Sequence, residues 1–311
     1  MNSNIDKPKY YNLKQWQFIL MMTTGVVVWA FAFPFIIKGL KELSFINLTI
    51  MRFFVVCVVL LIIILLKSNW FSKLHKKDII PIFLLGFFGV MVYHFGLNYG
   101  EQYITAGVAS LIIATIPVFI VIFATIFLKE KIGTKKLFGI LLALCGVIII
   151  SIFGKEDAAI EISYIFAAIA VLISAIFGAL YTIAGKKLLE RYNGLSLTAY
   201  AILLGSLGLI PFIRAELFAE VAEMSIDGWI AVLFLGIFST VIGYVIWYIA
   251  LEIKTASEIS IYLYAIPVLA TIISYFWFED TLTSFFILGG VLVIIGIYLV
   301  NKITKKLIKQ T

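Results

Sequence analysis

Long apolar runs alternate with short polar segments along the whole chain. Each run is close to the length of about 20 residues that a helix needs to cross the hydrocarbon core of a bilayer. We number ten such runs as spans 1 to 10: 16–37, 45–66, 79–99, 105–128, 134–153, 160–184, 195–213, 228–250, 256–278 and 283–301. The pattern predicts an all-α integral membrane protein with ten transmembrane helices.

The chain also repeats itself at an offset of 150 residues, most clearly around spans 4–5 and 9–10. The matched positions of the first copy are Thr105, Ala106, Ser110, Ile116, Pro117, Val118, Ile122, Gly139, Leu142 and Gly146. We therefore divide the chain into two repeats, 1–154 and 155–311, with five spans each. Because five is an odd number, the second repeat must be inverted in the membrane. Inverted repeats are typical of solute carriers whose site lies between the halves.

The basic residues predict the orientation of the spans. With a cytoplasmic N-terminus, nineteen Lys and Arg residues fall in inside segments, against four outside: Lys38, Lys41, Lys155 and Arg214. Cytoplasmic loops are enriched in Lys and Arg, so this split places both termini in the cytoplasm. We expect a multi-pass protein of the cell (plasma) membrane.

Composition narrows the class of protein. The chain is 63% hydrophobic and only 13% charged, with a mean hydropathy of +1.12. Typical soluble domains carry about 25% charged residues, so membrane integration is the favoured interpretation. The net charge of +7 follows from the basic loops between apolar runs, and we expect no nucleic acid partner.

Several motifs resemble one transporter family. The stretch TAGVASLIIATIPVFIVIFATIFLKEKIGTKKLFGILLALCGVIII (105–150) resembles the hairpin of the drug/metabolite transporter superfamily, in its EamA-type ten-span branch. IGYVIWYIALEIKTAS (242–257) and PVLATIISYFWFEDTLT (267–283) resemble its second copy, and VVVWAFAFPFIIK (26–38) resembles its first-span aromatic motif. Arg52, in LTIMRFFV, falls where the family often has an arginine. The resemblance implies a secondary transporter or exporter of small organic solutes, without fixing the solute.

The chain departs from the family pattern at two places. The second hairpin has Phe278, Glu279 and Asp280 where the family more often has a small residue followed by Glu. The second copy has Tyr200 and Ala201 in the stretch that corresponds to Arg52. We therefore expect the two halves to differ in function.

Ionisable and polar side chains within the spans are candidates for function, because burying them in hydrocarbon is costly. His94 and Asn98 are four residues apart on span 3 and share a helical face. His94 either contacts solute or a proton, or bonds a neighbouring carbonyl as a neutral ring. Glu258 near the start of span 9 is either a proton or charge site or a solvated helix-start residue.

Arg52 lies about seven residues into span 2. Its guanidinium either binds a carboxylate or phosphate of the solute, bonds other helices or extends to the interface. We favour the structural role, with Arg52 kept as a second candidate charge site.

Aromatic side chains give the larger signal for a solute cavity. Rings with a polar edge suit the wall of a wet cavity for amphipathic solutes, although Trp and Tyr also anchor spans at the interface. The predicted cavity residues are Trp29, Phe33, His94, Asn98, Tyr181, Tyr244, Trp247 and Tyr262. Spans 1, 3, 4, 6, 8 and 9 would enclose this cavity.

Prolines and glycines predict the mechanical parts. Pro117 and Pro267 fall in the middle of spans 4 and 9, where each removes an internal hydrogen bond, so we assign them as candidate hinges; a purely structural bend is the alternative. Gly133, Gly139 and Gly146 line span 5, and Gly289, Gly290 and Gly296 line span 10. Small residues favour close helix packing, so spans 5 and 10 either brace the cavity or form the contact of a homodimer.

The sequence contains no GxxxxGK[ST] loop, no HExxH motif and no Cys/His cluster with metal-ligand spacing. We expect no cofactor, no metal and no catalytic residue. The favoured function is export of small metabolites, such as amino acids, by alternating access at a central cavity. Uptake or exchange of sugars or nucleotides is the alternative, and a lipid-modifying enzyme that uses His94 and Glu258 is a remote one.

Overall fold

The computed structural model describes residues 13–128, 162–278 and 283–308, together with a few isolated positions between 138 and 149. All regular secondary structure in these parts is helical, which confirms the predicted all-α class. Seven helical stretches are long and apolar enough to cross a membrane: Gln15–Leu40, Phe45–Leu66, Lys76–Gly100, Ala106–Phe127, Ile162–Leu188, Gly194–Phe212 and Ile226–Ile253. Two shorter apolar helices are Tyr262–Trp277 and Ser284–Gly296. The remaining predicted span, 134–153, lies largely outside the described residues, so the count of ten stays a prediction.

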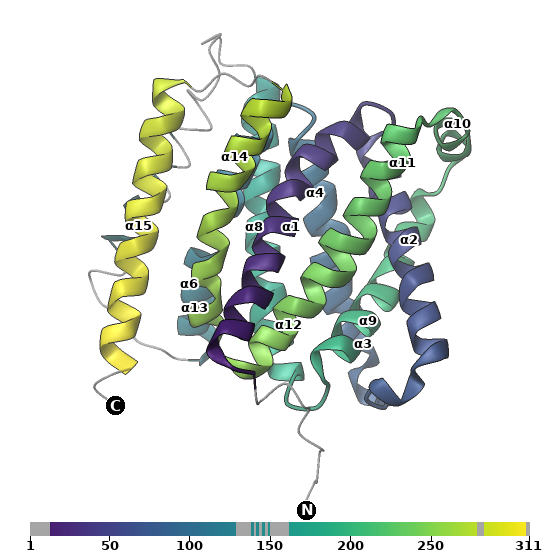
Figure 1. Cartoon of the computed structure of the whole chain (residues 1–311), viewed down its shortest axis with the longest axis horizontal. Helices are drawn as coiled ribbons and strands as arrows, with labels where there is room; N and C mark the ends of the chain where they lie inside the picture. Colours follow the sequence, from purple (N-terminus) through teal and green to yellow (C-terminus); the bar gives the residue numbers. More distant parts are fainter. Residues whose placement is uncertain are drawn as a thin grey trace, which may run out of the picture.

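The α-helical elements correspond to the predicted spans, several of which contain more than one element (Figure 1). Spans 1, 2, 6 and 10 are the single helices α1 (Gln15–Leu40), α2 (Phe45–Leu66), α8 (Ile162–Leu188) and α15 (Ser284–Ile308). Spans 3, 4 and 7 contain α3 (Ile79–Gly86) with α4 (Tyr93–Gly100), α5 (Ala106–Ile113) with α6 (Ile116–Leu128), and α9 (Gly194–Gly205). Spans 8 and 9 contain α11 (Ile226–Leu233) with α12 (Gly243–Ile253), and α13 (Ala256–Ile259) with α14 (Ala265–Phe278). The acidic segment between spans 7 and 8 forms a short helix, α10 (Ala215–Glu223).

Side chains at the helix starts explain several of these boundaries. The hydroxyls of Ser44, Thr105 and Ser225 each accept a hydrogen bond from a backbone N–H in the first turn of the helix that follows. The side-chain oxygen of Asn193 does the same for α9. Each cap satisfies a donor that the helix itself leaves unpaired.

Two spans in each half depart from α-helical geometry at matching positions. A π-helical segment joins α3 to α4 (Phe87–Val92), and another joins α11 to α12 (Phe234–Ile242). Span 4 breaks at residues 114–115, two residues before Pro117, and span 9 contains a 3-10 segment, Ser260–Tyr264, that ends three residues before Pro267. Matched breaks before two buried prolines agree with the predicted loss of helical hydrogen bonds there.

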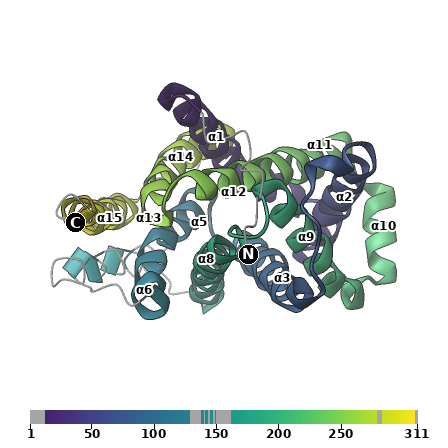
Figure 2. The same cartoon turned by 90° about the horizontal axis from the view of Figure 1, so that it is seen from below.

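The two halves of the chain pack crosswise. α4 and α6 of the first half pack against α8 of the second, while α12 and α14 of the second half pack against α1 of the first. α5 contacts α14, and α6 contacts α13, so the first part of span 4 meets the second part of span 9. Spans 4 and 9 therefore run antiparallel. Viewed end-on, α15 lies at one edge of the bundle and α10 at the opposite edge (Figure 2).

One contact between the halves is a direct meeting of backbones. A β-carbon placed on Gly86 of α3 would overlap the carbonyl of Ala201, and one placed on Gly205 of α9 would overlap the backbone of Gly86. A similar contact joins Gly146 to the backbone of Gly289. Glycine permits this close approach because it has no side chain.

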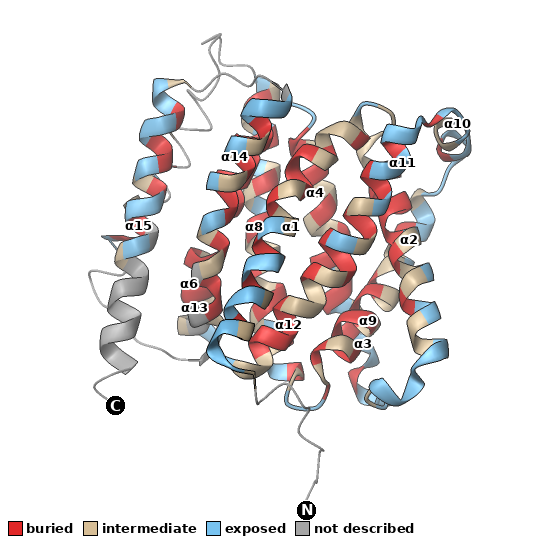
Figure 3. Cartoon of the chain, viewed as in Figure 1, coloured by how far each residue is buried: buried red, intermediate tan, exposed pale blue. Residues whose placement is uncertain are grey.

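Exposed positions lie along the outside of the bundle (Figure 3). Many of the exposed residues are large and apolar, including Phe54, Leu61, Ile80 and Phe276. A surface of this kind fits contact with lipid, since lipid-facing positions need no polar cover. The start of α1 and the end of α15 lie at the same end of the bundle (Figure 1).

Candidate functional site

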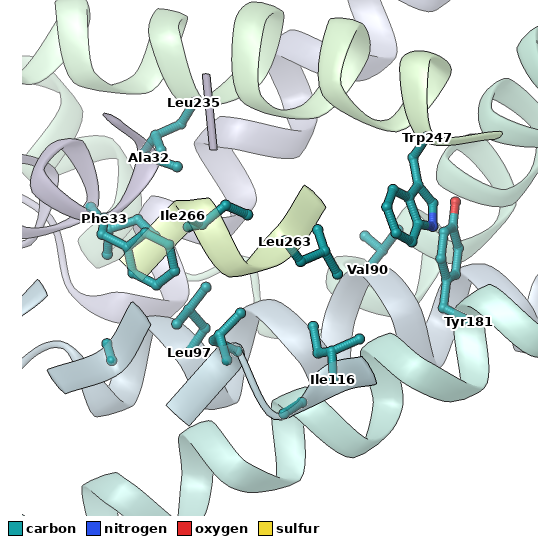
Figure 4. Close-up of a cluster of buried hydrophobic side chains, with 14 of the residues drawn as sticks. Ala32, Phe33, Val90, Leu97, Ile116, Tyr181, Leu235, Trp247, Leu263 and Ile266 are labelled. Carbon is teal, nitrogen blue, oxygen red and sulfur yellow. The ribbon is translucent and has the colours of Figure 1, made fainter. Parts of the chain in front are cut away.

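An open cavity lies among the helices of the bundle. Side chains from spans 1, 2, 3, 4, 6, 8 and 9 form its wall, so both halves of the chain contribute. The apolar part of the wall includes Ala32, Phe33, Leu97, Ile116, Leu263 and Ile266. Figure 4 shows Phe33 toward one end of this cluster and the rings of Trp247 and Tyr181 side by side at the other.

Aromatic rings form a continuous part of the wall between the two halves. The ring centroid of Trp29 lies 5.7 Å from that of Trp247 and 6.3 Å from that of Tyr244. Tyr181 lies 5.5 Å from Tyr244 in an edge-to-face arrangement. Contacts of this geometry add to the stability gained from burial and hold the rings in place.

Each indole N–H in this wall has a hydrogen-bond partner. Trp29 Nε1 donates to the carbonyl of Ser239 at 3.0 Å, and Trp247 Nε1 donates to Thr182 Oγ1 at 3.2 Å. Both rings therefore present their apolar faces, rather than a free donor, toward the cavity. Such faces suit the apolar part of a solute.

His94 is held by the π-helical segment that precedes it. Its Nδ1 lies 2.8 Å from the carbonyl of Val90, one of the residues in Phe87–Val92, while the rings of Tyr93 and Phe53 each lie 4.8 Å from the imidazole. A hydrogen bond to a carbonyl requires the proton on Nδ1, which leaves Nε2 of the neutral ring as an acceptor. The imidazole can therefore accept a hydrogen bond from a solute.

Arg52 is buried, with 3% of its surface exposed, and it connects the two halves. Its Nε donates to Thr240 Oγ1 at 2.8 Å, and its Nη2 donates to Ser239 Oγ at 3.1 Å. Both hydroxyls belong to the π-helical segment of span 8. Arg52 therefore does not extend to the membrane surface; it bonds another helix, as the favoured structural role requires, and it also lines the cavity.

Many cavity residues come in pairs that the 150-residue offset relates. His94 and Tyr244 are one such pair, and their ring centroids lie 6.2 Å apart. The other pairs on the wall are Ala32 and Thr182, Gly89 and Ser239, Leu97 and Trp247, Ile113 and Leu263, and Ile116 and Ile266. Equivalent residues of a twofold arrangement come this close only near its axis.

Seven of the predicted residues, Trp29, Phe33, Arg52, His94, Tyr181, Tyr244 and Trp247, lie on the cavity wall. Asn98 and Tyr262 lie outside that lining. Asn98 is buried and donates from Nδ2 to Thr49 Oγ1 at 2.9 Å, while the ring of Tyr262 packs against Phe18 at 6.2 Å. These placements leave the predicted role in solute binding as a prediction for each residue.

The three remaining predicted residues are not part of the wall. Pro117 and Pro267 are buried shortly after the breaks in spans 4 and 9, next to the lining residues Ile116 and Ile266. The side chain of Glu258 lies outside the described residues, so its predicted role as a charge site stays a prediction.

Three polar residues were missed by the sequence analysis. Ser239 and Thr240 hold Arg52, and Glu101 is buried just beyond the end of α4 with no hydrogen-bond partner for either carboxylate oxygen. The serine and threonine are polar residues within an apolar run, which was a usable signal. Glu101 was overlooked because it falls in the loop between two predicted spans.

Among the described residues, no group of three or more His, Cys, Asp and Glu side chains is placed to hold a metal ion. The cavity instead offers apolar faces, one guanidinium, one imidazole acceptor and several hydroxyl-bearing side chains, among them Tyr181, whose hydroxyl has no hydrogen-bond partner in the described part of the chain. This set suits reversible binding of a small amphipathic molecule.

Comparisons with known proteins agree with this description. A model of the EamA-like transporter family matches two segments, residues 16–152 and 165–302. A protein of Archaeoglobus fulgidus named as an uncharacterized transporter is 38% identical over 290 residues, covering 93% of this chain and 99% of that protein. A protein of Streptantibioticus cattleyicolor named as a probable terminal-alkyne amino-acid exporter is 31% identical over 279 residues, covering 90% and 91%.

A solved crystal structure resembles the fold. It superimposes with a TM-score of 0.65 at 17% identity, covering 94% of this chain and 99% of that chain. At this level of identity the likeness concerns the fold alone.

Proposed function

The chain belongs to the EamA-like transporter family and is a membrane transporter of that type, and we propose that it exports small organic metabolites such as amino acids. The solute binds in the central cavity, which opens to the two sides of the membrane in turn. The protein acts as a secondary transporter, without nucleotide hydrolysis. A probable amino-acid exporter among the relatives supports this solute class.

The observation that carries the proposal is the composition of the cavity wall. Both halves of the chain contribute to it, and six pairs of residues related by the 150-residue offset face the same space. A site at the interface of two repeats can be exposed to either side by a motion of the elements around it. The antiparallel packing of spans 4 and 9 supports an inverted arrangement of the repeats.

The chemistry of the wall favours an amphipathic solute with at most one negative group. Arg52 is the one Lys or Arg side chain on the described wall, and two of its N–H groups already bind Ser239 and Thr240. An arginine can bind a carboxylate, and the rings of Trp29 and Trp247 can pack against an apolar side chain. Solutes with several phosphate charges would need more cationic partners.

Solute exchange in proteoliposomes tests this proposal. Vesicles preloaded with one unlabelled amino acid from a panel are diluted into the labelled form, and we expect accumulation without nucleotide for at least one apolar amino acid. Trp247→Ala and His94→Ala should lower the exchange rate about tenfold, which corresponds to about 1.4 kcal/mol of lost interaction.

Matched controls are available in the same chain. Trp16 is 60% exposed at the start of α1, and His75 lies outside the cavity lining, so Trp16→Ala and His75→Ala should exchange at the unmodified rate. Equal rates in all four variants would remove the cavity from the mechanism. Absence of exchange across the whole panel would contradict the solute class.

We also propose the full topology, which is ten spans in two inverted repeats with both termini in the cytoplasm. The membrane is the plasma membrane. Single cysteines at positions 130 and 280, in a background without Cys57 and Cys145, provide the test. An impermeant maleimide applied to intact cells should label position 280 and spare position 130. Labelling of both from the same side would overturn the inverted arrangement.

A homodimer through spans 5 and 10 remains part of the proposal. Gly146 and Gly289 already meet within one chain, so the dimer contact would use the other faces of these spans, such as the exposed Leu288, Ile295 and Tyr298. Mass measurement of the detergent-solubilised protein is the direct test. A monomer that exchanges solute at the full rate would exclude a functional need for the dimer.

A further inference from the structure

Three buried oxygen atoms at the end of α4 have no hydrogen-bond partner. They are Oδ1 of Asn98 and both carboxylate oxygens of Glu101. Asn98 is 0% exposed and Glu101 is 5% exposed. The two residues are three positions apart, so they share one face of this end of the helix. All three unpartnered atoms are acceptors when Glu101 is ionised, so they require a donor or a cation.

Arg52, which could supply such a cation, has other partners in this structure. Thr49 and Arg52 share a face of α2, and Thr49 Oγ1 accepts the hydrogen bond of Asn98, which brings the two faces together. Arg52 and Glu101 interact electrostatically, but Arg52 donates to Ser239 and Thr240 rather than to the carboxylate. The guanidinium therefore has two competing partners, on opposite halves of the chain.

Other groups around Glu101 do not compensate a negative charge. The surface of α8 that meets Gly100 consists of Ala167 and Val171, and the one titratable group beyond them toward the start of α8 is the phenol of Tyr164. On α4 itself the titratable groups are His94, Tyr99 and Tyr93, the last of which interacts electrostatically with Glu101.

In the first turn of α2, Asn47 donates a hydrogen bond to Glu220 of α10, which adds a second carboxylate at that end of the bundle. Burial raises the pKa of the Glu101 carboxyl well above its usual range, against the opposing effect of Arg52. The neutral, protonated carboxyl is thus the form that fits these surroundings. The neighbouring Gln102 and Tyr103 are exposed, so the carboxyl lies close to the surface of the protein.

We propose that Glu101 is the proton-binding site that couples transport to the proton gradient. With a proton on Glu101, Arg52 stays on the hydroxyls of span 8, as in this structure. Loss of the proton creates a carboxylate that attracts Arg52 away from Ser239 and Thr240 and loosens the contact between the halves. Proton binding and the arrangement of the helices around the cavity are thereby linked.

This inference rests on the proposed transport function, so the experiment separates the two. Two fluxes are measured in the same proteoliposomes, with the amino acid that the exchange panel identifies: exchange without a pH gradient, and net flux against the solute gradient driven by an imposed pH gradient. E101Q mimics the protonated carboxyl and should keep exchange within about twofold while losing the gradient-driven flux. E101D should retain part of that flux, because it can still bind a proton.

The protonation state is measured independently of any solute. Dicyclohexylcarbodiimide reacts with protonated carboxyls in apolar surroundings, and peptide mass mapping locates the product. At neutral pH, Glu101 should be labelled about tenfold more than the exposed Glu216 and Glu223, and its labelling should fall as the pH rises.

Each outcome has one interpretation. Gradient-driven flux that survives in E101Q, or the absence of labelling at Glu101 in the unmodified protein, would overturn the proton site and leave the transporter proposal intact. Absence of exchange in the unmodified protein would contradict the proposed function, while the labelling result would still decide whether Glu101 holds a proton. Loss of both fluxes in E101Q and E101D would assign Glu101 a structural role and overturn the coupling role.

Discussion

The two π-helical segments of the bundle occupy equivalent places in the two halves but serve different contacts. In the first half, the carbonyl of Val90 binds His94 of the same span. In the second half, the carbonyl of Ser239 binds Trp29, and the hydroxyls of Ser239 and Thr240 bind Arg52. The first segment therefore uses its polar groups locally, whereas the second uses them to hold the other half.

The two halves share a backbone feature but differ in the side chains around it. A π-helical turn leaves backbone groups available to other partners, and such turns are frequent at functional sites. Both halves have such a turn beside the cavity, while the side chains at equivalent positions differ. Arg52 and the residues that bind it occur once, so the site is asymmetric even where the helices match.

The largest effect is expected from removing the second segment's hydroxyls. Ser239→Ala combined with Thr240→Val leaves the guanidinium of Arg52 buried without these partners, and we expect a loss of about 3 kcal/mol or more in the free energy of unfolding. Unfolding in mixed micelles measures it. Ser110→Ala is the matched control, because that hydroxyl bonds only Gly107 of its own helix, and it should cost about 1 kcal/mol. Equal losses would show that Arg52 does not depend on these hydroxyls.

A smaller loss of stability is expected from removing the hydrogen bond between His94 and Val90 in the first half. His94→Phe keeps an aromatic ring but removes the donor to Val90, and it should lower the free energy of unfolding by about 1–2 kcal/mol. His94→Asn can still donate and should recover part of this loss. If the asparagine variant is the less stable of the two, the ring contacts with Tyr93 and Phe53 outweigh the hydrogen bond.

The smallest loss of stability is expected from removing the hydrogen bond between the indole of Trp29 and the carbonyl of Ser239. Trp29→Phe removes the indole donor to the carbonyl of Ser239 and should cost about 0.5–1.5 kcal/mol, partly through lost apolar contact. Trp247→Phe, which loses its bond to Thr182 instead, is the matched control with a similar expected cost. A much larger loss for Trp29→Phe would show that the second π-helical segment needs the bond to keep its shape.

The sequence predicted much of the fold because the length of an apolar run is a strong local signal. The bounds of α2 match the predicted span 45–66, and helices are interrupted shortly before Pro117 and Pro267, whose role as hinges stays a prediction. The π-helical segments were not predicted, since a single extra residue in a helical turn leaves no distinct pattern among apolar residues. The crosswise packing of spans 3 and 4 against α8 also depends on contacts between distant segments.

For the candidate site, the type of a residue helped to predict which side chains line the cavity. The sequence did not show which way each side chain points from its helix. Trp29, His94 and Trp247 line the cavity, whereas Asn98 shares a helix with His94 yet binds Thr49 outside the lining. The face that a side chain occupies depends on the rotation of its helix against neighbours, which the π-helical turn alters in span 3. Ser239 and Thr240 become visible as a binding pair only when Arg52, nearly 190 positions away, is placed beside them.

The glycine contact between α3 and α9 bears on how the protein moves. Gly86 and Gly205 bring two main chains into direct contact, with no side chain in between to change rotamer and let one helix slide along the other. We therefore expect spans 3 and 7 to move together, although they come from different halves of the chain. In the proposed alternating-access cycle, the rigid bodies would then combine spans from both halves.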